Sequence, residues 1–291
     1  GCEPTDVIVA STGVIGRRYP IDRVVAGIAD LASQPTGTSA DRAAAGIMTT
    51  DTVAKVAEAT IAGSSARVVG IAKGVGMIEP DMATMIAVVF TDADIDGDQL
   101  DAMFRRVVDR TFNCVSIDTD TSTSDTAVVF ASGIAGAVDA DALEVALDHV
   151  CLALTKMIAI DGEGAETLIE VTVDLAKDEA QAKRVAKAIV NSPLVKTAVH
   201  GADPNWGRVA MAIGKCSDDT DIDQDQVVIR FGATEVYPRQ VDNTALAALS
   251  SYMASDDVLI HVSLGTGEAT ATVWGCDLTD GYVRINADYT T

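Results

Sequence analysis

Histidine is scarce in this chain of 291 residues, which contains only His149, His200 and His261. The sequence also lacks a G-x-S-x-G nucleophile elbow and an H-E-x-x-H zinc motif. His149 falls in a stretch with helical periodicity and His261 in a strand-like run, which favours structural roles for both. These features therefore argue against a Ser-His-Asp hydrolase and favour a nucleophile with another general base.

Paired cysteines and long apolar runs are also missing. The five cysteines are far apart, odd in number and never in a C-x-x-C pair, which argues against a disulfide framework or a zinc site. We expect buried free thiols. No apolar run is long enough to span a membrane, and the first residues, GCEPTD, lack the basic-then-apolar signal pattern. The sequence predicts a cytoplasmic protein.

Lysine is rare, and acidic residues dominate. The chain has 8 Lys and 13 Arg against 33 Asp and 10 Glu, with a net charge of −22 that would repel nucleic acid. The acidic residues are spread along the whole chain rather than gathered in a tail. This pattern favours a halophilic protein, kept in solution where salt screens self-repulsion, over an ordinary acidic enzyme.

The composition is typical of a globular protein, because 48% of the residues are hydrophobic. Helical periodicity appears in three stretches, and strand-like runs alternate with them. The predicted helices cover 21–31, 100–108 and 143–158; the predicted strands are 67–72, 85–90, 126–131, 168–173, 227–231, 258–264 and 282–285. This mixture predicts a layered α/β or α+β fold. The glycine-rich stretch 161–166 is the best boundary, giving domains 1–165 and 166–291.

The segment DADIDGDQLDAM (92–103) imitates a calcium loop. Asp92, Asp94 and Asp96 fall at the first three ligand positions, but Met103 stands where the bidentate Glu belongs. A polar turn that caps a helix starting near Asp98 is the better interpretation. We expect no metal site.

The stretch GMIEPDMATMIAVVF (76–90) changes from a loop into a buried strand at Ala83 and Thr84. A chain cut before a threonine gains an α-amine that can act as general base for that residue's own hydroxyl. The pKa of an α-amine lies near 8, close enough to neutrality for this task. Ala83 is small, and the strand after Thr84 would hold the new amine still.

Three other polar positions are candidates, each with a plain alternative. Thr12 and Gly13, between the strand-like VIVA and the helix after Pro20, could stabilise an oxyanion or form a simple turn. Lys73, between glycines, could bind a carboxylate or lie solvated in a loop. The MTTDT segment could be a helix-ending turn capped by Asp51.

Together these segments resemble the ornithine acetyltransferase family, the ArgJ-type glutamate N-acetyltransferases. The matching blocks follow one another along the chain: VASTGVIG (9–16), IMTTDT (47–52), GIAKGVGMIEPDMATM (70–85), DTSTSDT (120–126), AIDGEGAE (159–166), SPLVKTAV (192–199), GADPNWGR (201–208) and INADYTT (285–291). The third and seventh blocks are highly specific. Family members usually carry a longer segment before the first block, with an NxGxANA signature, so we expect a truncated or short form.

The resemblance implies a sandwich of sheets and helices with a smaller C-terminal α+β domain. It implies self-cleavage between Ala83 and Thr84 into α and β chains, assembled as a hetero-oligomer of αβ units. Thr84 would then carry the acetyl group from N2-acetylornithine to glutamate in a ping-pong cycle of arginine biosynthesis, without a cofactor. Some relatives also use acetyl-CoA.

The resemblance also assigns individual residues. Thr12 and Gly13 match the oxyanion pair. The substrate-binding positions are Thr49 (with Thr50 as its alternative), Lys73, Thr84, Glu163, Asn286 and Thr291. A diamino acid needs an acidic partner for its amine and a cation or amides for its carboxylate, and Glu163 and Lys73 provide one of each.

Two other functions stay open. A related N-terminal-nucleophile aminopeptidase or amidase would share the self-cleavage and the oxyanion pair, although the DPNWGR and NADYTT blocks favour the transferase. A non-enzymatic acidic protein that binds metal through its Asp runs would stay an intact chain.

Overall fold

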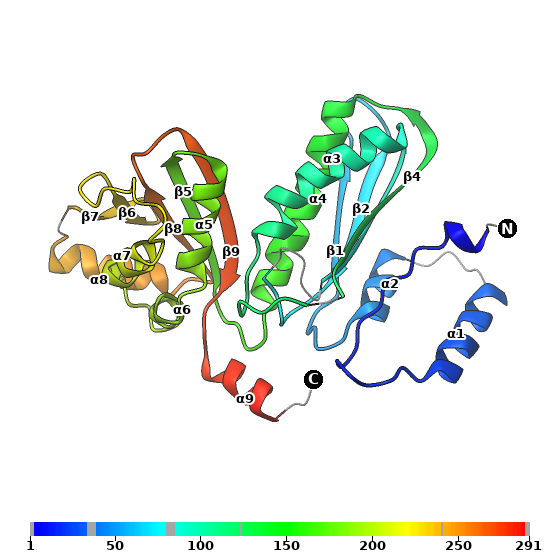
Figure 1. The fold of residues 1–291 in the computed structure, drawn as a ribbon, viewed down its shortest axis with the longest axis horizontal. Coiled ribbons are helices and arrows are strands. Elements are labelled where there is room, and N and C mark those ends of the chain that lie inside the picture. The colour runs from blue at the N-terminus through cyan, green and yellow to red at the C-terminus, as the bar shows by residue number, and fades with distance from the viewer. Residues whose placement is uncertain (1–2, 34–38, 80–84, 123, 240, 289–291) are drawn as a thin grey trace.

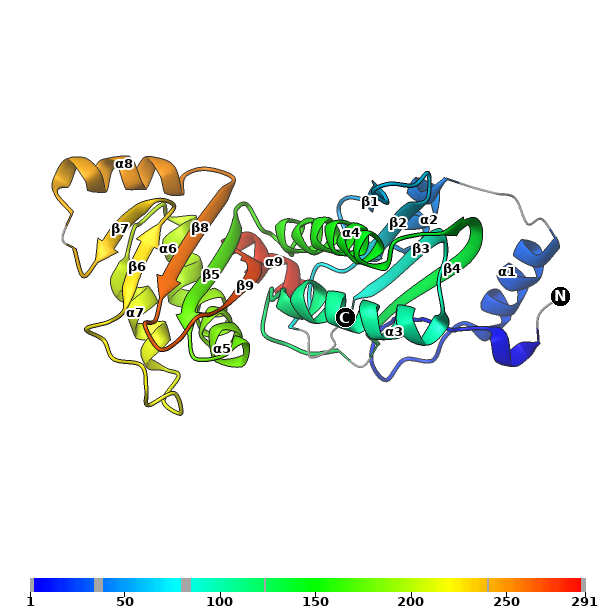
Figure 2. The same cartoon turned by 90° about the horizontal axis from the view of Figure 1, so that it is seen from above.

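The computed structural model describes residues 3–33, 39–79, 85–122, 124–239 and 241–288. Three predicted site residues, Ala83, Thr84 and Thr291, lie outside these ranges. Figure 1 shows two sheets with helices, set side by side, and the turned view of Figure 2 shows the same arrangement. The predicted layered mixture of helices and sheets is confirmed.

The first sheet has four strands in the order β1-β2-β3-β4. Its strands are β1 (Lys55–Thr60), β2 (Arg67–Lys73), β3 (Ile86–Asp94) and β4 (Thr126–Ala137). The first two pairings are antiparallel, whereas β3 and β4 are parallel. A parallel pair needs a long crossover, and helix α3 (Gly97–Arg110) lies within it. Three predicted strands are thereby confirmed.

Helices α2 (Ala40–Ile47), α3 and α4 (Ala140–Ile160) lie beside the first sheet. α4 lies very close to β2 at Gly70, where a Cβ atom would come within 2.7 Å of Val150 and 2.8 Å of Leu154. Glycine therefore allows the helix to approach the strand. The predicted stripe on α4 is confirmed, because Leu147, Val150 and Leu154 are buried.

The second sheet has five strands in the order β7-β6-β8-β5-β9. Its elements are β5 (Leu168–Ala176), β6 (Val228–Phe231), β7 (Thr234–Tyr237), β8 (Asp257–Ser263), β9 (Ala269–Cys276) and the helices α5 (Glu179–Val190), α6 (Pro193–His200), α7 (Trp206–Gly214) and α8 (Asn243–Met253). The predicted strands near 168–173, 227–231 and 258–264 are confirmed. A single cluster of buried apolar side chains runs through both sheets and their helices.

The segment before β4 joins the two sheets. Val115 bridges Trp274 of β9, and the Ser116 N–H donates to the Trp274 carbonyl over 2.8 Å. The Ile117 N–H donates to the Ile78 carbonyl over 2.7 Å. The loop after β2 is therefore tied through this segment to the edge of the second sheet.

The prediction of a strand at 282–285 is wrong, because these residues belong to helix α9 (Asp280–Asp288). No neighbouring strand of the described chain pairs with this segment, and a helix satisfies its own backbone groups. The Thr279 hydroxyl accepts from the Tyr282 N–H at the first turn. Val283 remains 61% exposed, so the apolar residues that suggested a strand are not core residues.

The N-terminal part departs from the compact pattern. The strand-like VIVA (7–10) has no regular structure, since it pairs with no strand of the described chain. Helix α1 (Ile21–Ser33) is confirmed, but it stands apart from both sheets in Figures 1 and 2. Its predicted apolar face is exposed, with Leu31 at 73%.

The calcium-like segment is used for capping, as predicted. The Asp96 side chain accepts from the N–H groups of Asp98 and Gln99 and caps α3, which begins at Gly97. Asp92 accepts from the Arg67 N–H over 2.7 Å. These carboxylates therefore bind backbone amides.

Candidate active site

The candidate site begins where β2 ends, at Lys73. The Lys73 side chain is buried, and its ammonium donates to the Thr49 hydroxyl over 3.0 Å. Burial lowers the pKa of Lys73, an effect that the nearby carboxylate of Asp51 opposes. Thr49 lies in the turn between α2 and β1, so two separate segments bring these predicted residues together.

Asp51 holds this arrangement in place: it caps the turn after α2, as the plain alternative had it, and also binds the loop after β2. Its carboxylate is buried and accepts from the Gly74 N–H over 2.7 Å and the Thr49 N–H over 3.1 Å. Burial would raise the pKa of Asp51, but the Lys55 ammonium and these amides outweigh it, so the pKa is lowered. Asp51 thus fixes the backbone at Thr49 and beside Lys73.

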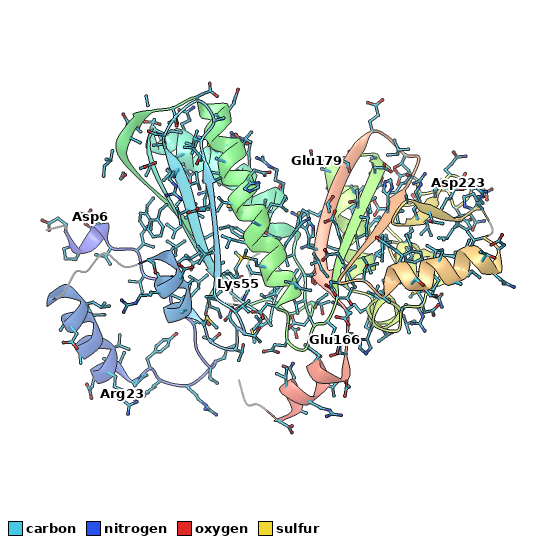
Figure 3. All side chains as sticks on the ribbon, turned by 180° about the vertical axis from the view of Figure 1, so that it is seen from behind. Asp6, Arg23, Lys55, Glu166, Glu179 and Asp223 are labelled. Carbon is cyan, nitrogen blue, oxygen red and sulfur yellow. The ribbon has the colours of Figure 1, made fainter. Side chains whose placement is uncertain are left out.

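Lys55, the first residue of β1 and labelled in Figure 3, is a buried cation between two buried carboxylates. Its ammonium lies 2.8 Å from Asp51 and 2.5 Å from Asp161, which follows the last residue of α4. Asp161 also accepts from the backbone and hydroxyl of Thr52. This Asp51–Lys55–Asp161 triad connects the Thr49 turn to the end of α4. It was missed from sequence.

Glu163 lies two residues after Asp161 and contacts the loop that follows Lys73. Its N–H donates to the Val75 carbonyl over 2.8 Å, and a Cβ atom on Gly76 would lie 2.8 Å from its carboxyl carbon. The Glu163 carboxylate accepts from the Asn286 amide of α9 over 2.9 Å. The fold thus brings Glu163 and Asn286 together beside the loop that starts at Lys73.

Gly164 allows α9 to reach this position. Its φ of +71° is in the left-handed region, and a Cβ atom there would lie 2.4 Å from the Tyr282 backbone nitrogen. The Thr279 hydroxyl donates to the Gly164 carbonyl over 2.6 Å. The C-terminal helix is therefore seated directly on the turn that carries Glu163.

Asp125, which precedes β4, is another residue missed from sequence. One of its oxygens, Oδ1, accepts from the Met85 N–H over 2.8 Å. Its other oxygen, Oδ2, is buried and has no hydrogen-bond partner within the described ranges. Burial raises the pKa of Asp125 to about 6, and the Met85 N–H and the charge of Lys73 oppose this rise. Its position in a Ser/Thr/Asp cluster just before a strand was the available signal.

Thr12 and Gly13 are not joined to this cluster. In the described part of the chain, neither makes a hydrogen bond to Thr49, Lys73 or Glu163. Thr12 is partly buried and Gly13 exposed, and the Tyr19 ring lies against Gly13. Their assignment as an oxyanion pair stays a prediction.

One group of three potential metal ligands occurs in the described residues: Glu166, His200 and Asp277. Asp277 Oδ1 accepts from the N–H groups of Glu166 and Thr167, and Oδ2 lies 3.0 Å from His200 Nδ1. Both oxygens thus already bind protein groups. This group holds the start of β5 against β9 and α6.

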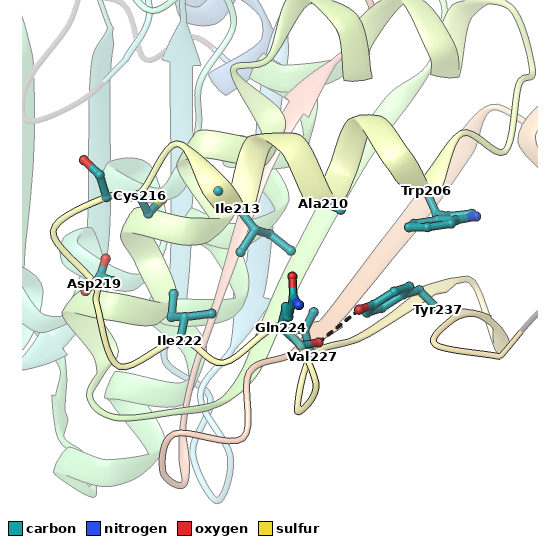
Figure 4. A pocket seen from close by; sticks show the side chains of 11 residues that line it. Trp206, Ala210, Ile213, Cys216, Asp219, Ile222, Gln224, Val227 and Tyr237 are labelled. Carbon is teal, nitrogen blue, oxygen red and sulfur yellow. Dashed lines mark hydrogen bonds between the residues drawn. The ribbon is translucent and has the colours of Figure 1, made fainter.

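A cavity of about 530 Å³ lies in the second sheet's half, between α7 and the β6–β7 side (Figure 4). Trp206 stacks on Tyr237 at its edge, with ring centroids 5.0 Å apart. The Tyr237 hydroxyl donates to the Gln224 carbonyl, and the lining carboxylate Asp219 is paired with Arg184. None of the predicted site residues within the described ranges lines this cavity, which therefore lies apart from the Lys73 cluster.

Comparison with known proteins identifies the family. The ArgJ family model matches residues 1–291. The chain belongs to the ArgJ family. It is 58% identical over 291 residues to the arginine biosynthesis bifunctional protein ArgJ 2 of Nostoc sp., covering 100% of this chain and 75% of that protein. It is 58% identical over 297 residues to the glutamate N-acetyltransferase Oat2 of Streptomyces clavuligerus, with the same coverage. Because relatives with these names are 58% identical to it, this ArgJ-family chain is an acyltransferase.

A solved structure also matches. The arginine biosynthesis bifunctional protein ArgJ of Bacillus halodurans is 40% identical, with a TM-score of 0.61 over 68% of this chain and 96% of that one. Of the helices described in this ArgJ-family chain, none combines the length and hydropathy that crossing a bilayer requires.

Proposed function

We propose that this enzyme transfers an acetyl group from N2-acetylornithine to glutamate through an acetyl-Thr84 intermediate, in arginine biosynthesis. One observation carries the proposal: the buried Lys73 ammonium and the Glu163 carboxylate flank one loop, beside the start of β3. A cation and an anion that flank one loop suit a zwitterionic diamino acid. Thr84 is joined directly to Met85 at the start of that strand.

The proposed cycle begins with self-cleavage. The Thr84 hydroxyl attacks the Ala83 carbonyl, the C–N bond breaks as the nitrogen takes the hydroxyl proton, and an ester results. Water then hydrolyses the ester, which leaves a carboxyl group on Ala83 and a free α-amine on Thr84. The α and β chains remain assembled as a hetero-oligomer of αβ units.

Acetyl transfer then uses the new amine as general base. The amine takes the Thr84 hydroxyl proton while the oxygen attacks the acetyl carbonyl, and the proton passes to the departing ornithine nitrogen. In the second half of the cycle the glutamate amine attacks the acetyl ester, the ester C–O bond breaks, and the proton lost by the glutamate nitrogen passes through the α-amine to the Thr84 oxygen. The Thr12 hydroxyl and Gly13 N–H stabilise the oxyanion of each tetrahedral intermediate.

The remaining residues bind substrate in this proposal. Lys73, held by Thr49, binds the substrate carboxylate, and Glu163, held by Asn286, binds the side-chain amine. Thr291 contributes from the end of the chain. We also propose a division into units 1–165 and 166–291 that meet at the Glu163 turn. A cytoplasmic location and a halophilic host complete the proposal; the free thiols Cys114, Cys151 and Cys276 support a reducing compartment.

Substitutions at Thr84 test the mechanism. Thr84→Ala lacks the hydroxyl and should stay a single chain that N-acetylornithine does not acetylate, whereas Thr84→Ser should still cleave. Thr12→Ala should lower turnover roughly 100- to 1,000-fold, as loss of one oxyanion donor does. Thr60→Ala, at an exposed strand end, is the matched control. A denaturing gel and intact mass give the result.

A Thr84→Ala chain that splits before residue 84, or becomes acetylated, would refute the mechanism. Assays with N-acetylornithine, acetyl-CoA and peptide amides as acyl donors decide between the transferase, its acetyl-CoA-using form and the aminopeptidase or amidase.

A further inference from the structure

Lys73 and Glu163, the two residues proposed to bind the ends of the substrate, come from different segments of the chain. Lys73 is the last residue of β2, and Glu163 lies in the turn after α4. A backbone hydrogen bond from the Glu163 N–H to the Val75 carbonyl joins the two segments directly. A diamino acid that is bound at both ends is sensitive to the distance between its two partners. The contacts that fix these segments against each other therefore decide which substrate fits.

The Lys73 side of the site is held by Asp51. Its carboxylate accepts from the Thr49 N–H over 3.1 Å and from the Gly74 N–H over 2.7 Å. The Thr49 hydroxyl in turn accepts from the Lys73 ammonium, and Gly74 is the next residue after Lys73. Asp51 therefore sets both the backbone and the hydrogen-bond partner of Lys73.

The Glu163 side is held by Asp161, the C-cap of α4, which lies two residues earlier in the chain. Gly162 between them is tightly packed, because a Cβ atom there would lie 2.8 Å from the Cys276 sulfur. Asp161 also accepts from the backbone and the hydroxyl of Thr52. A displacement of Asp161 would therefore move Glu163 with it.

Lys55 connects the two sides, since its ammonium lies 2.8 Å from Asp51 and 2.5 Å from Asp161. All three side chains are almost fully buried, so salt screens these attractions little. Specifying one arrangement of the chain is a role that some buried ion pairs serve. We propose that this triad determines substrate length: it holds Lys73 and Glu163 at the separation that fits the ornithine side chain and disfavours a homologue one methylene longer. This inference rests on the proposed function. The triad residues act through Lys73 and Glu163, so they are positioning residues.

The test measures kcat/KM for N2-acetylornithine and for N2-acetyllysine in the full chain, with glutamate as acceptor. The two donors carry the same carboxylate and amine and differ by one methylene, and the ratio of their kcat/KM values does not depend on the amount of folded enzyme. The wild-type chain should favour N2-acetylornithine roughly 10- to 200-fold, the range that one methylene is worth in a shaped site. Lys55→Met and Asp161→Asn should each lower this ratio roughly 10-fold, the lower end of that range. Ile229→Ala, at a fully buried position of β6, should lower the melting temperature but keep the wild-type ratio.

The outcomes separate the two proposals. If the wild-type chain transfers no acetyl group from N2-acetylornithine, the proposed function fails and this inference falls with it. If the wild-type chain transfers acetyl but uses both donors equally well, or if both triad variants keep the wild-type ratio, the role of the triad alone is refuted.

Two further results concern stability. A ratio that falls as far in Ile229→Ala as in Lys55→Met would assign the effect to a general loosening of the fold and overturn the proposal. Should Lys55→Met lose its cooperative melt, Asp161→Asn carries the test, because it leaves the pair of Lys55 with Asp51 in place and keeps an acceptor for Thr52. An unchanged ratio in Asp161→Asn then refutes the role of the triad.

Discussion

Replacing Lys55 with methionine should destabilise the fold strongly, because it removes the cation between two buried carboxylates. The Lys55 and Asp51 side chains are 0% exposed and Asp161 is 4% exposed, with ion-pair distances of 2.8 and 2.5 Å. Removing one partner of a buried pair costs about 3–5 kcal/mol, since the remaining charge is left unpaired. At about 2–4 °C per kcal/mol for a chain of this size class, the melting temperature should fall by roughly 6–20 °C.

A thermal melt with two comparison variants makes this measurement specific. Adding Asp161→Asn to Lys55→Met removes one of the two carboxylates and should recover part of the loss. Arg105→Ala breaks an ion pair with Asp101 of similar length, 2.7 Å, whose side chains are 77% and 62% exposed, and should leave the melt unchanged. If Lys55→Met lowers the melting temperature no more than Arg105→Ala, the buried triad does not stabilise the fold as argued.

The pH dependence of this loss has a definite sign. The pKa of Asp51 is lowered below its usual 3.8 in the fold. A group with a lowered folded pKa contributes stability above its unfolded pKa, and this contribution is lost as the pH falls through the folded pKa. The stability gap between wild type and Lys55→Met should therefore be full at pH 5–7 and narrow below about 3.8.

Three further predictions concern the site and the surface. Lys73→Ala and Glu163→Gln should each lower kcat/KM roughly 10- to 150-fold while the melting temperature stays near wild type, because each removes a charge-assisted substrate contact; normal turnover by a folded variant refutes that role. Gly164→Ala should displace α9 and reduce acetyl transfer, because its Cβ would lie 2.4 Å from the Tyr282 nitrogen. Gly63→Ala, with a similar φ of +75° and open space around it, should change only the melting temperature. Equal turnover in both variants would contradict this prediction. The net charge of −22 should make the melting temperature rise from low to molar salt, as the Debye length shrinks from about 30 Å to about 3 Å, and a flat series would refute the halophilic interpretation.

Six strands, β2 to β6 and β8, were predictable because their signal is local, whereas β1, β7 and β9 were not predicted. The runs ending at Phe90 and Ala131 are short, apolar and bounded by turn residues, which is typical of strands in a buried sheet. The segment 282–285 carries the same local signal but pairs with no strand of the described ranges, and it forms a helix. The presence of a neighbour is a tertiary property that a run of four residues does not contain.

The site was predictable only in part, for the same reason. Lys73 attracted notice because lysine is rare and because it lies between glycines. Lys55 did not, since its role depends on Asp161, which lies 106 residues further along the chain. Asp125 is 40 residues from Met85, and only the parallel register of β3 and β4 makes them neighbours.

The pairing of β2 with β3 has a consequence for a chain that is cut before residue 84. β2 would then belong to one fragment and β3 to the other. Six residue pairs, from Val68↔Thr91 to Lys73↔Ile86, would still join the two fragments as neighbouring strands of one sheet. The fragments could separate only if β2 and β3 came apart in the middle of the sheet, which would expose inner residues, such as Ala87 and Val89, that are fully buried. Hydrolysis would thus change the covalent connectivity but not the architecture: the two pieces should elute together from a sizing column and part only in denaturant.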